Sequence, residues 1–155
     1  MYKEGHAGLS FLLFSPFLLL FRSLNADTTY ILTTGILMVG LSSLPDIDME
    51  YRKYGIEHRG RTTHSLLFGI AVGVLLSILI GYAYGALGWL MGFVAGFGAT
   101  ASHLLADTFT KHSFKPLYPF SNREVAFRFF EASNKKANNA VLFLGLMSFV
   151  FSFLA

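Results

Sequence analysis

Residues 62–102 form a run of 41 residues without a single Asp, Glu, Lys or Arg. A helix needs about 20 apolar residues to cross the hydrocarbon core of a bilayer, so this run is long enough for two crossings. Three further runs without these charged residues cover 5–21, 28–45 and 137–155. Because only 14% of the chain is charged, against about 25% in a typical soluble domain, the sequence indicates an integral membrane protein.

We therefore expect an all-α fold, a single transmembrane helical domain over residues 1–155. It would be a polytopic bundle of about five transmembrane helices, with four as the alternative. The expected spans are roughly 7–24, 28–44, 63–82, 87–106 and 138–155. Asp27 is a suitable N-cap for the second span. Residues 122–133 predict a short interfacial helix with Phe129 and Phe130 facing lipid.

In the five-span arrangement every Lys and Arg except Arg22 falls on one side of the membrane. The positive-inside rule then predicts a multi-pass protein of the cytoplasmic (inner or plasma) membrane, with the N-terminus and the segments 46–62 and 107–136 in the cytoplasm. The net charge of +3 reflects this topology, and no direct nucleic-acid binding is expected. The absence of cysteine excludes disulfides and thiolate metal ligands.

The expected span ends on that side also carry histidines and acidic residues. These residues are His6, Asp46, Asp48, His58, His64, His103 and Asp107, followed by His112. They are far apart in sequence but lie at one membrane depth, where neighbouring helix ends would bring them together. Ionisable groups at such positions in a membrane bundle are usually functional. We therefore expect a polar cluster at the cytoplasmic helix ends.

Helical spacing adds detail to this cluster. His103 and Asp107 are four residues apart, so they share one face of a helix. Small residues recur every four positions on two of the expected spans, Gly88, Gly92 and Gly96 on the fourth and Ser65, Gly69 and Gly73 on the third. Such stripes allow helices to approach closely. The face with His103 and Asp107 is therefore expected to point into the bundle, not towards lipid.

Histidine and carboxylate ligands without thiolates suit zinc, with manganese or iron as alternatives. The candidate metal ligands are His6, Asp46, Asp48, His64, His103 and Asp107. They exceed what one zinc ion needs, which allows one or two divalent ions. A catalytic metal keeps one position open for water and serves hydrolysis. Arg59 is a candidate for binding an anionic group such as phosphate, and His58 for acid/base chemistry or a further ligand.

The motifs LPDID, HRGRTTHS and SHLLAD, in this order, resemble the YdjM-like family, and EGHAG and PLYPFS fit the same pattern. Members of that family are described as inner-membrane, metal-dependent hydrolases and are also labelled LexA-binding. The resemblance covers roughly residues 5–121 and implies a helical membrane protein with a metal-assisted hydrolytic site. It adds Thr63 and Ser65 to the site residues, with a catalytic assignment for His58, Arg59 and Ser65. This chain has Arg61 and Thr62 where the family pattern has one residue between HRG and THS.

The favoured function is a membrane-embedded, metal-dependent hydrolase at the cytoplasmic face, acting on a phosphoester or related bond of a lipid or lipid-linked substrate. One alternative is a metal-binding structural or regulatory membrane protein without catalysis. Another is a metal-free lipid phosphatase that uses a phosphohistidine, since SHLLAD supplies an H-x-x-x-D pattern. The sequence leaves open a protein partner and a homo-oligomer.

Overall fold

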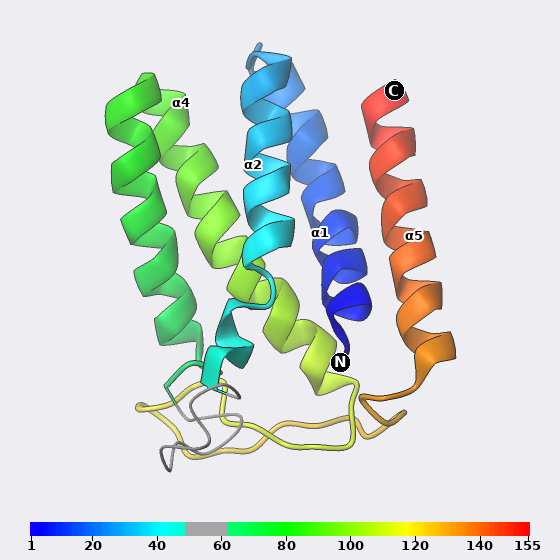
Figure 1. Ribbon diagram of the computed structural model, residues 1–155. Helices are drawn as coiled ribbons and strands as arrows, with labels where there is room; N and C mark the ends of the chain where they lie inside the picture. Colours follow the sequence, from blue (N-terminus) through cyan, green and yellow to red (C-terminus); the bar gives the residue numbers. More distant parts are fainter. Residues whose placement is uncertain (49–61) are drawn as a thin grey trace.

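The computed structural model describes residues 1–48 and 62–155, which form a bundle of helices lying side by side (Figure 1). The elements are α1 (Lys3–Ser23), α2 (Thr28–Leu41), the short 3-10 helix η1 (Leu44–Asp46), α4 (Leu66–Thr108) and α5 (Lys135–Leu154). The described residues contain two isolated β-bridges and no strand. The all-α prediction is therefore confirmed.

Four helices are long and apolar enough to cross a membrane, as the four-helix alternative expects. The longest, α4, has 43 residues and turns back on itself at Gly85, where φ is +73° and ψ is −155°. Across this reversal the Ser77 hydroxyl donates to the Trp89 carbonyl at 2.7 Å. The two limbs of α4 are helices joined at this kink; they lie side by side in Figure 1 and correspond to the third and fourth expected spans.

The predicted stripes of small residues hold these two limbs together. A Cβ atom added to Gly92 would meet the carbonyl of Leu76, and one added to Gly96 would meet that of Val72. Glycine allows this approach because it has no side chain to keep the backbones apart. The limb that carries His103 is thereby fixed against the limb that follows His64.

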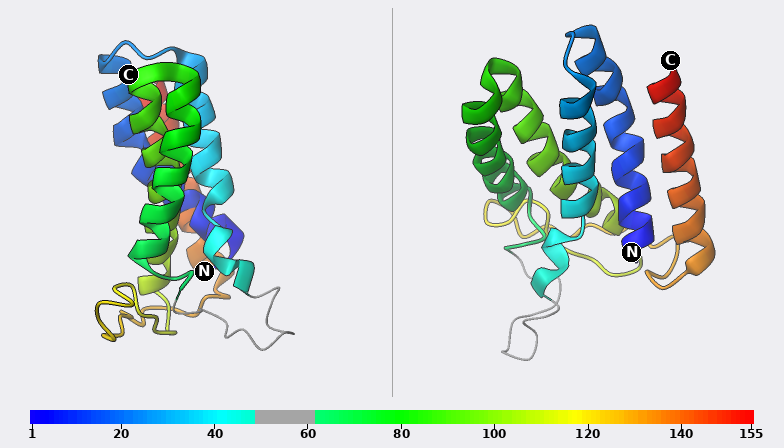
Figure 2. Two further views of the ribbon diagram at one scale, coloured as in Figure 1. Left: turned by 90° about the vertical axis from the view of Figure 1, so that its left-hand side faces the viewer. Right: turned by 45° about the horizontal axis from the view of Figure 1, so that its top comes forward.

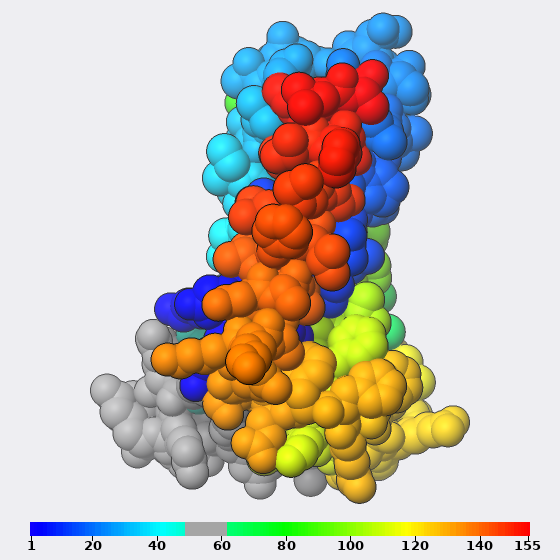
Figure 3. All heavy atoms as spheres, turned by 90° about the vertical axis from the view of Figure 1, so that its right-hand side faces the viewer, coloured from blue at the N-terminus to red at the C-terminus, as the bar shows by residue number. Residues whose placement is uncertain are grey.

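A second close approach joins α1 to α5, the helix that covers one side of the bundle in Figure 3. A Cβ atom on Gly145 would meet the carbonyl of Gly8, so the two backbones touch. The helix α2 packs against α1 and α4, and Figure 2 shows the resulting arrangement from two further directions. Phe14, Leu18 and Met38 belong to the apolar cluster between these helices.

Two helix starts can be compared with the predictions. Asp27 is the N-cap of α2, as predicted, and its carboxylate accepts a hydrogen bond from the backbone N–H of Thr29 at 2.7 Å. The first helix begins at Lys3, four residues before the predicted start at residue 7. His6 therefore lies within α1, where its direction is fixed by the helix.

The predicted interfacial helix over 122–133 is wrong, because this segment contains no helix in the structure. Thr110 pairs with Phe130 and Phe114 with Val125 in the two β-bridges. Phe129 is exposed and stacks on Phe109, whereas Phe130 packs against the buried cluster that includes Ala106. The two bridges, and not a helix, thus hold this segment against residues 110–114.

Candidate metal centre

Six of the predicted site residues gather at the end of the bundle where the N-terminus lies (Figure 1). They come from four places in the chain: His6 from α1, Asp46 from η1 and Asp48 just after it, His64 just before α4, and His103 and Asp107 from the second limb of α4. The three imidazoles are fully buried, and the Asp48 and Asp107 side chains are almost so. The prediction that His103 and Asp107 face the inside of the bundle is confirmed.

The centre of the cluster is the meeting point of His64 and His103. Their Nε2 atoms are 3.3 Å apart. The Oδ1 atom of Asp46 lies 3.6 Å from Nε2 of His64 and 3.7 Å from Nε2 of His103. The Oδ2 atom of Asp107 lies 3.9 Å and 3.7 Å from the same two nitrogens. Two imidazoles and two carboxylates thus converge on one small volume.

The outer nitrogens of both histidines are held from behind. Nδ1 of His103 donates to the carbonyl of Ser42 at 2.7 Å, an acceptor that requires the proton on Nδ1. Nδ1 of His64 lies 3.3 Å from Oδ2 of Asp48. Thr63 donates its hydroxyl to the same carboxylate oxygen at 3.1 Å. The Thr63 hydroxyl oxygen is a second partner of His64, 3.1 Å from Nδ1. With the protons on Nδ1, the Nε2 lone pairs of His64 and His103 face each other.

Two neutral imidazoles with facing lone pairs repel unless a proton or a cation lies between them. Metal-binding histidines commonly have this arrangement, with the outer N–H donated to a carboxylate or a backbone carbonyl. The donor set therefore fits a divalent cation. Without a cation the buried carboxylates of this donor set would be unfavourable, because buried carboxylates are normally paired or bound to metal.

His6 completes the cluster from the side of α1. Its ring stacks on His103 with centroids 4.0 Å apart and planes 7° from parallel. Its Nε2 atom lies 3.8 Å from Oδ1 of Asp107 and 3.9 Å from Oδ2 of Asp46. Its Nδ1 atom is buried and has no hydrogen-bond partner within the described part of the chain. A buried ring nitrogen of this kind marks a position where a ligand is needed.

Two overlapping groups of residues have ligand atoms within 4.8 Å of one another: His6, Asp46 and His103, and His64, His103 and Asp107. His103 belongs to both groups. This geometry accommodates either one ion bound by residues of both groups or two ions, one in each group, with His103 next to both. All ligand atoms are imidazole nitrogens or carboxylate oxygens, the set that suits zinc, manganese or iron.

The α-amino group of Met1 also reaches the cluster and contacts Oδ1 of Asp107 at 2.6 Å. Asn138 of α5 fixes this end of the chain, since its Oδ1 atom accepts from the N–H of Tyr2 at 2.9 Å. Its Nδ2 atom donates to the carbonyls of Ala132 and Asn134. The side of the site formed by α1 therefore depends on α5.

The remaining predicted residues have other positions. Asp48 is in neither ligand group and lies behind His64, beside Nδ1. Ser65 is the N-cap of α4: its hydroxyl accepts from the N–H of Phe68 and donates to the carbonyl of Thr62. His58 and Arg59 lie outside the described residues.

Three contributors to the site were missed by the sequence analysis. Ser42 acts through its backbone carbonyl, which leaves no signal in the residue type. The buried Ser10–Ser102 hydrogen bond at 2.6 Å ties α1 to α4 beside His103. Asn138 is the one of the three with a readable signal, because a polar side chain within an apolar span usually has a structural or functional partner.

The cluster opens towards solvent at Asp46, the side chain of which is 20% exposed. Asp46 lines a pocket of about 520 Å³ between the start of α1 and the end of α2. The imidazoles are thus buried, and Asp46 is the cluster residue that borders the pocket. Buried ligands with one accessible carboxylate are compatible with catalysis as well as with storage of an ion.

Comparison with known families gives one match, to the model described as YdjM inner membrane protein, over residues 1–154. No curated protein and no solved structure matches the chain.

Proposed function

The chain belongs to the YdjM inner membrane protein family, and from that premise we propose that it is a metal-dependent hydrolase of the cytoplasmic membrane. Its substrate would carry a phosphoester or related bond in a lipid or lipid-linked molecule. The observation that carries the proposal is the 3.3 Å approach of the His64 and His103 Nε2 atoms, with both outer nitrogens held by acceptors.

His64, His103, Asp107 and Asp46 would hold the metal, with His6 as a fifth ligand or as part of a second ion's set. Zinc is favoured by the nitrogen and oxygen donors, with manganese or iron as alternatives. A divalent cation bound there supplies Lewis-acid chemistry and lowers the pKa of water. Asp48 would orient His64 and keep its proton on Nδ1.

Asp46 lies where a group that orients and deprotonates water is expected. It is the most exposed of the acidic cluster residues, and one of its oxygens lies within 4 Å of the buried imidazoles. A water molecule that enters through the adjacent pocket meets this carboxylate first. Asp46 would orient the water and accept its proton as the scissile bond is attacked.

A lipid or lipid-linked substrate is favoured by the depth of the site. The cluster lies at the ends of apolar helices, which is where lipid headgroups would meet water if these helices span a bilayer. The described basic residues at the same end are Lys3, Lys111, Lys115, Arg123, Arg128, Lys135 and Lys136, and Arg22 is near the other end. By the positive-inside rule this end would face the cytoplasm.

The proposal is tested by hydrolysis of bis(p-nitrophenyl) phosphate and p-nitrophenyl acetate by purified protein, before and after chelation and after zinc is restored. We expect a chelator-sensitive activity that zinc restores. His103→Ala should abolish both the activity and the bound metal. His112→Ala is the matched control, since His112 is an exposed histidine at the same end of the bundle and in neither ligand group.

Two outcomes would overturn the proposal. Stoichiometric metal without turnover of either substrate, or of a phospholipid, would indicate a structural ion site. Turnover that survives chelation but is lost in His103→Ala would indicate metal-free chemistry through a phosphohistidine.

A further inference from the structure

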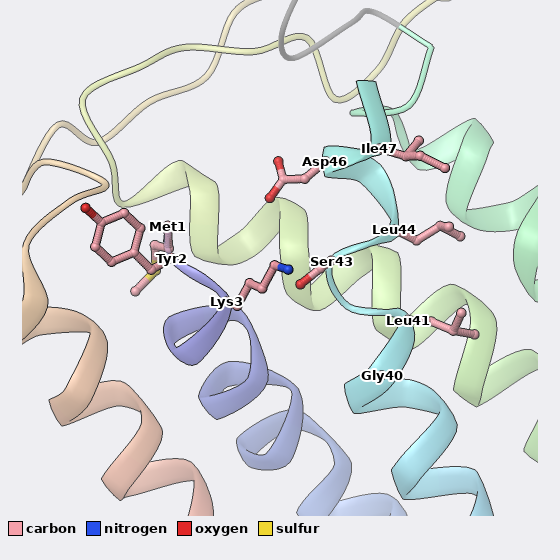
Figure 4. A pocket seen from close by; sticks show the side chains of 9 residues that line it. All are labelled: Met1, Tyr2, Lys3, Gly40, Leu41, Ser43, Leu44, Asp46 and Ile47. Carbon is pink, nitrogen blue, oxygen red and sulfur yellow. The ribbon is translucent and has the colours of Figure 1, made fainter. Parts of the chain in front are cut away.

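The pocket beside Asp46 has a lining of two kinds. Apolar surface comes from Leu41 at the end of α2, Leu44 in η1 and Ile47 just after η1. Lys3, from the first turn of α1, contributes an ammonium group, and Figure 4 shows its side chain extended towards Ser43 with Asp46 nearby. The volume of about 520 Å³ is in the range of small-molecule sites.

We propose that this pocket is the substrate-binding site for a lipid with a phosphate headgroup, and that Lys3 is the residue that selects the anionic head. The inference rests on the proposed hydrolase function for its purpose, but lipid binding can be measured without turnover. It adds what the metal cluster alone does not give: where the substrate enters, which end enters first and which residue recognises it.

The charge in the pocket supports a phosphate. Lys3 is exposed, and its ammonium group makes no ion pair or hydrogen bond with any residue that the structure describes. An ammonium group is a common phosphate ligand. The Ser43 hydroxyl, on the opposite wall, adds a second donor. An anion between them would lie next to Asp46, the exposed edge of the metal centre.

The same pocket contains Asp46, and this carboxylate would repel a phosphate in the absence of a cation. With a divalent cation bound to the cluster, the negative charge of Asp46 is offset and the anion is attracted from both sides. The inference therefore predicts that lipid binding depends on the metal as well as on Lys3. A simple surface attraction to Lys3 would have no such dependence.

The apolar wall supports a lipid over a water-soluble phosphoester. Leu41, Leu44 and Ile47 offer contact to a hydrocarbon chain but nothing to a polar leaving group. Ile47 is 42% exposed, which is unfavourable in water unless something covers it. The pocket lies at the level where α1 begins and α2 ends, so a lipid reaches it with its chains still in the bilayer.

The test measures binding of dioleoyl phosphatidic acid to zinc-loaded protein in detergent by native mass spectrometry. Dioleoylglycerol, oleate, glycerol 3-phosphate and inorganic phosphate serve as comparison ligands. We expect phosphatidic acid to bind in preference to all four. Lys3→Gln should weaken that binding roughly tenfold, the size of one charge-assisted contact. Lys3→Arg should retain it, and so should Lys136→Gln, which removes an exposed lysine at the same end of the bundle.

Leu44→Ser should weaken binding of phosphatidic acid but not of inorganic phosphate, which identifies the wall that holds the chain. Removal of zinc should weaken phosphatidic acid binding in the wild type. Equal binding by wild type, Lys3→Gln and Lys136→Gln would overturn the inference, and so would tighter binding of glycerol 3-phosphate or oleate than of phosphatidic acid.

The two proposals fail separately. Lys3-dependent binding of phosphatidic acid without any hydrolysis would contradict the hydrolase and leave the lipid site standing. Chelator-sensitive hydrolysis of a soluble phosphodiester, unaffected by Lys3→Gln and without lipid binding, would leave the hydrolase standing and contradict the lipid site.

Discussion

Alanine at Gly8 tests whether the contact between α1 and α5 sets the geometry of the metal centre. A Cβ atom at Gly8 would lie 2.5 Å from the backbone nitrogen of Leu142 and 2.6 Å from the carbonyl carbon of Val141. Non-bonded contact requires about 3.5 Å. Because both obstacles are backbone atoms, the two helices have to separate by about 1 Å.

The cost follows from this displacement. Overpacking of this kind costs about 1–3 kcal/mol, and the change from glycine to alanine within a helix returns about 0.5–1 kcal/mol. The difference is a loss of about 0–2.5 kcal/mol of unfolding free energy, and we expect the upper half of this range because both obstacles are backbone atoms. His6 is two residues before Gly8, and its Nε2 atom lies 3.8 Å from Oδ1 of Asp107. A shift of α1 should thus weaken metal binding as well.

The assay is equilibrium unfolding in mixed micelles by titration with dodecyl sulfate, together with the metal content of the folded protein. Gly40→Ala is the matched control, because a Cβ atom at Gly40 meets nothing within 4 Å. That variant should be as stable as the wild type or slightly more so. Equal stability and equal metal content for Gly8→Ala and Gly40→Ala would refute the reasoning.

Three further predictions follow from single residues. Gly85→Ala should lose about 1–2 kcal/mol of unfolding free energy in the same titration, because φ is +73° at this residue. No neighbour lies within 4 Å of an added Cβ, so the cost comes from the backbone alone. Unchanged stability would contradict the reversal at this residue. Asn138→Leu should lose about 1–3 kcal/mol of unfolding free energy, since the N–H of Tyr2 and the carbonyl of Ala132 lose a buried partner. A stable variant with full metal content would show that α5 does not position the N-terminus. Asp48→Asn should lower zinc affinity roughly 10- to 100-fold in a competition titration with a chromophoric chelator, because Asp48 orients His64 from behind; complete loss of zinc would instead make Asp48 a ligand.

Much of the fold could be predicted from the uncharged runs, because a bilayer admits few arrangements of long apolar segments. The reversal near residue 85 could be located to a few residues, but not the residue at which the chain turns, Gly85, which has a positive φ. The helix predicted over 122–133 is absent, and isolated bridges and a turn take its place. The contacts that hold this segment, such as the pairing of Phe114 with Val125, leave no signal in the residue types.

The candidate site was predictable to the extent that side-chain chemistry carries it. His103 and Asp107 shared a helical face by spacing alone, and small-residue stripes indicated which way that face points. The different positions of the acidic residues within the cluster could not be predicted from the sequence. Asp46 and Asp48 are two residues apart, yet one borders the buried imidazole Nε2 atoms and the other lies behind His64. That difference arises from the turn at η1.

The most direct test of the central claim is X-ray absorption spectroscopy at the zinc edge on zinc-loaded protein. We expect a first shell of nitrogen and oxygen at about 2.0–2.1 Å from zinc, with the multiple scattering of at least two imidazoles. His103→Ala should lose one imidazole from this shell if that variant retains any zinc. A first shell without imidazole scattering, or wild-type protein that retains no metal from a zinc-containing buffer, would contradict the convergence of His64 and His103 on one cation.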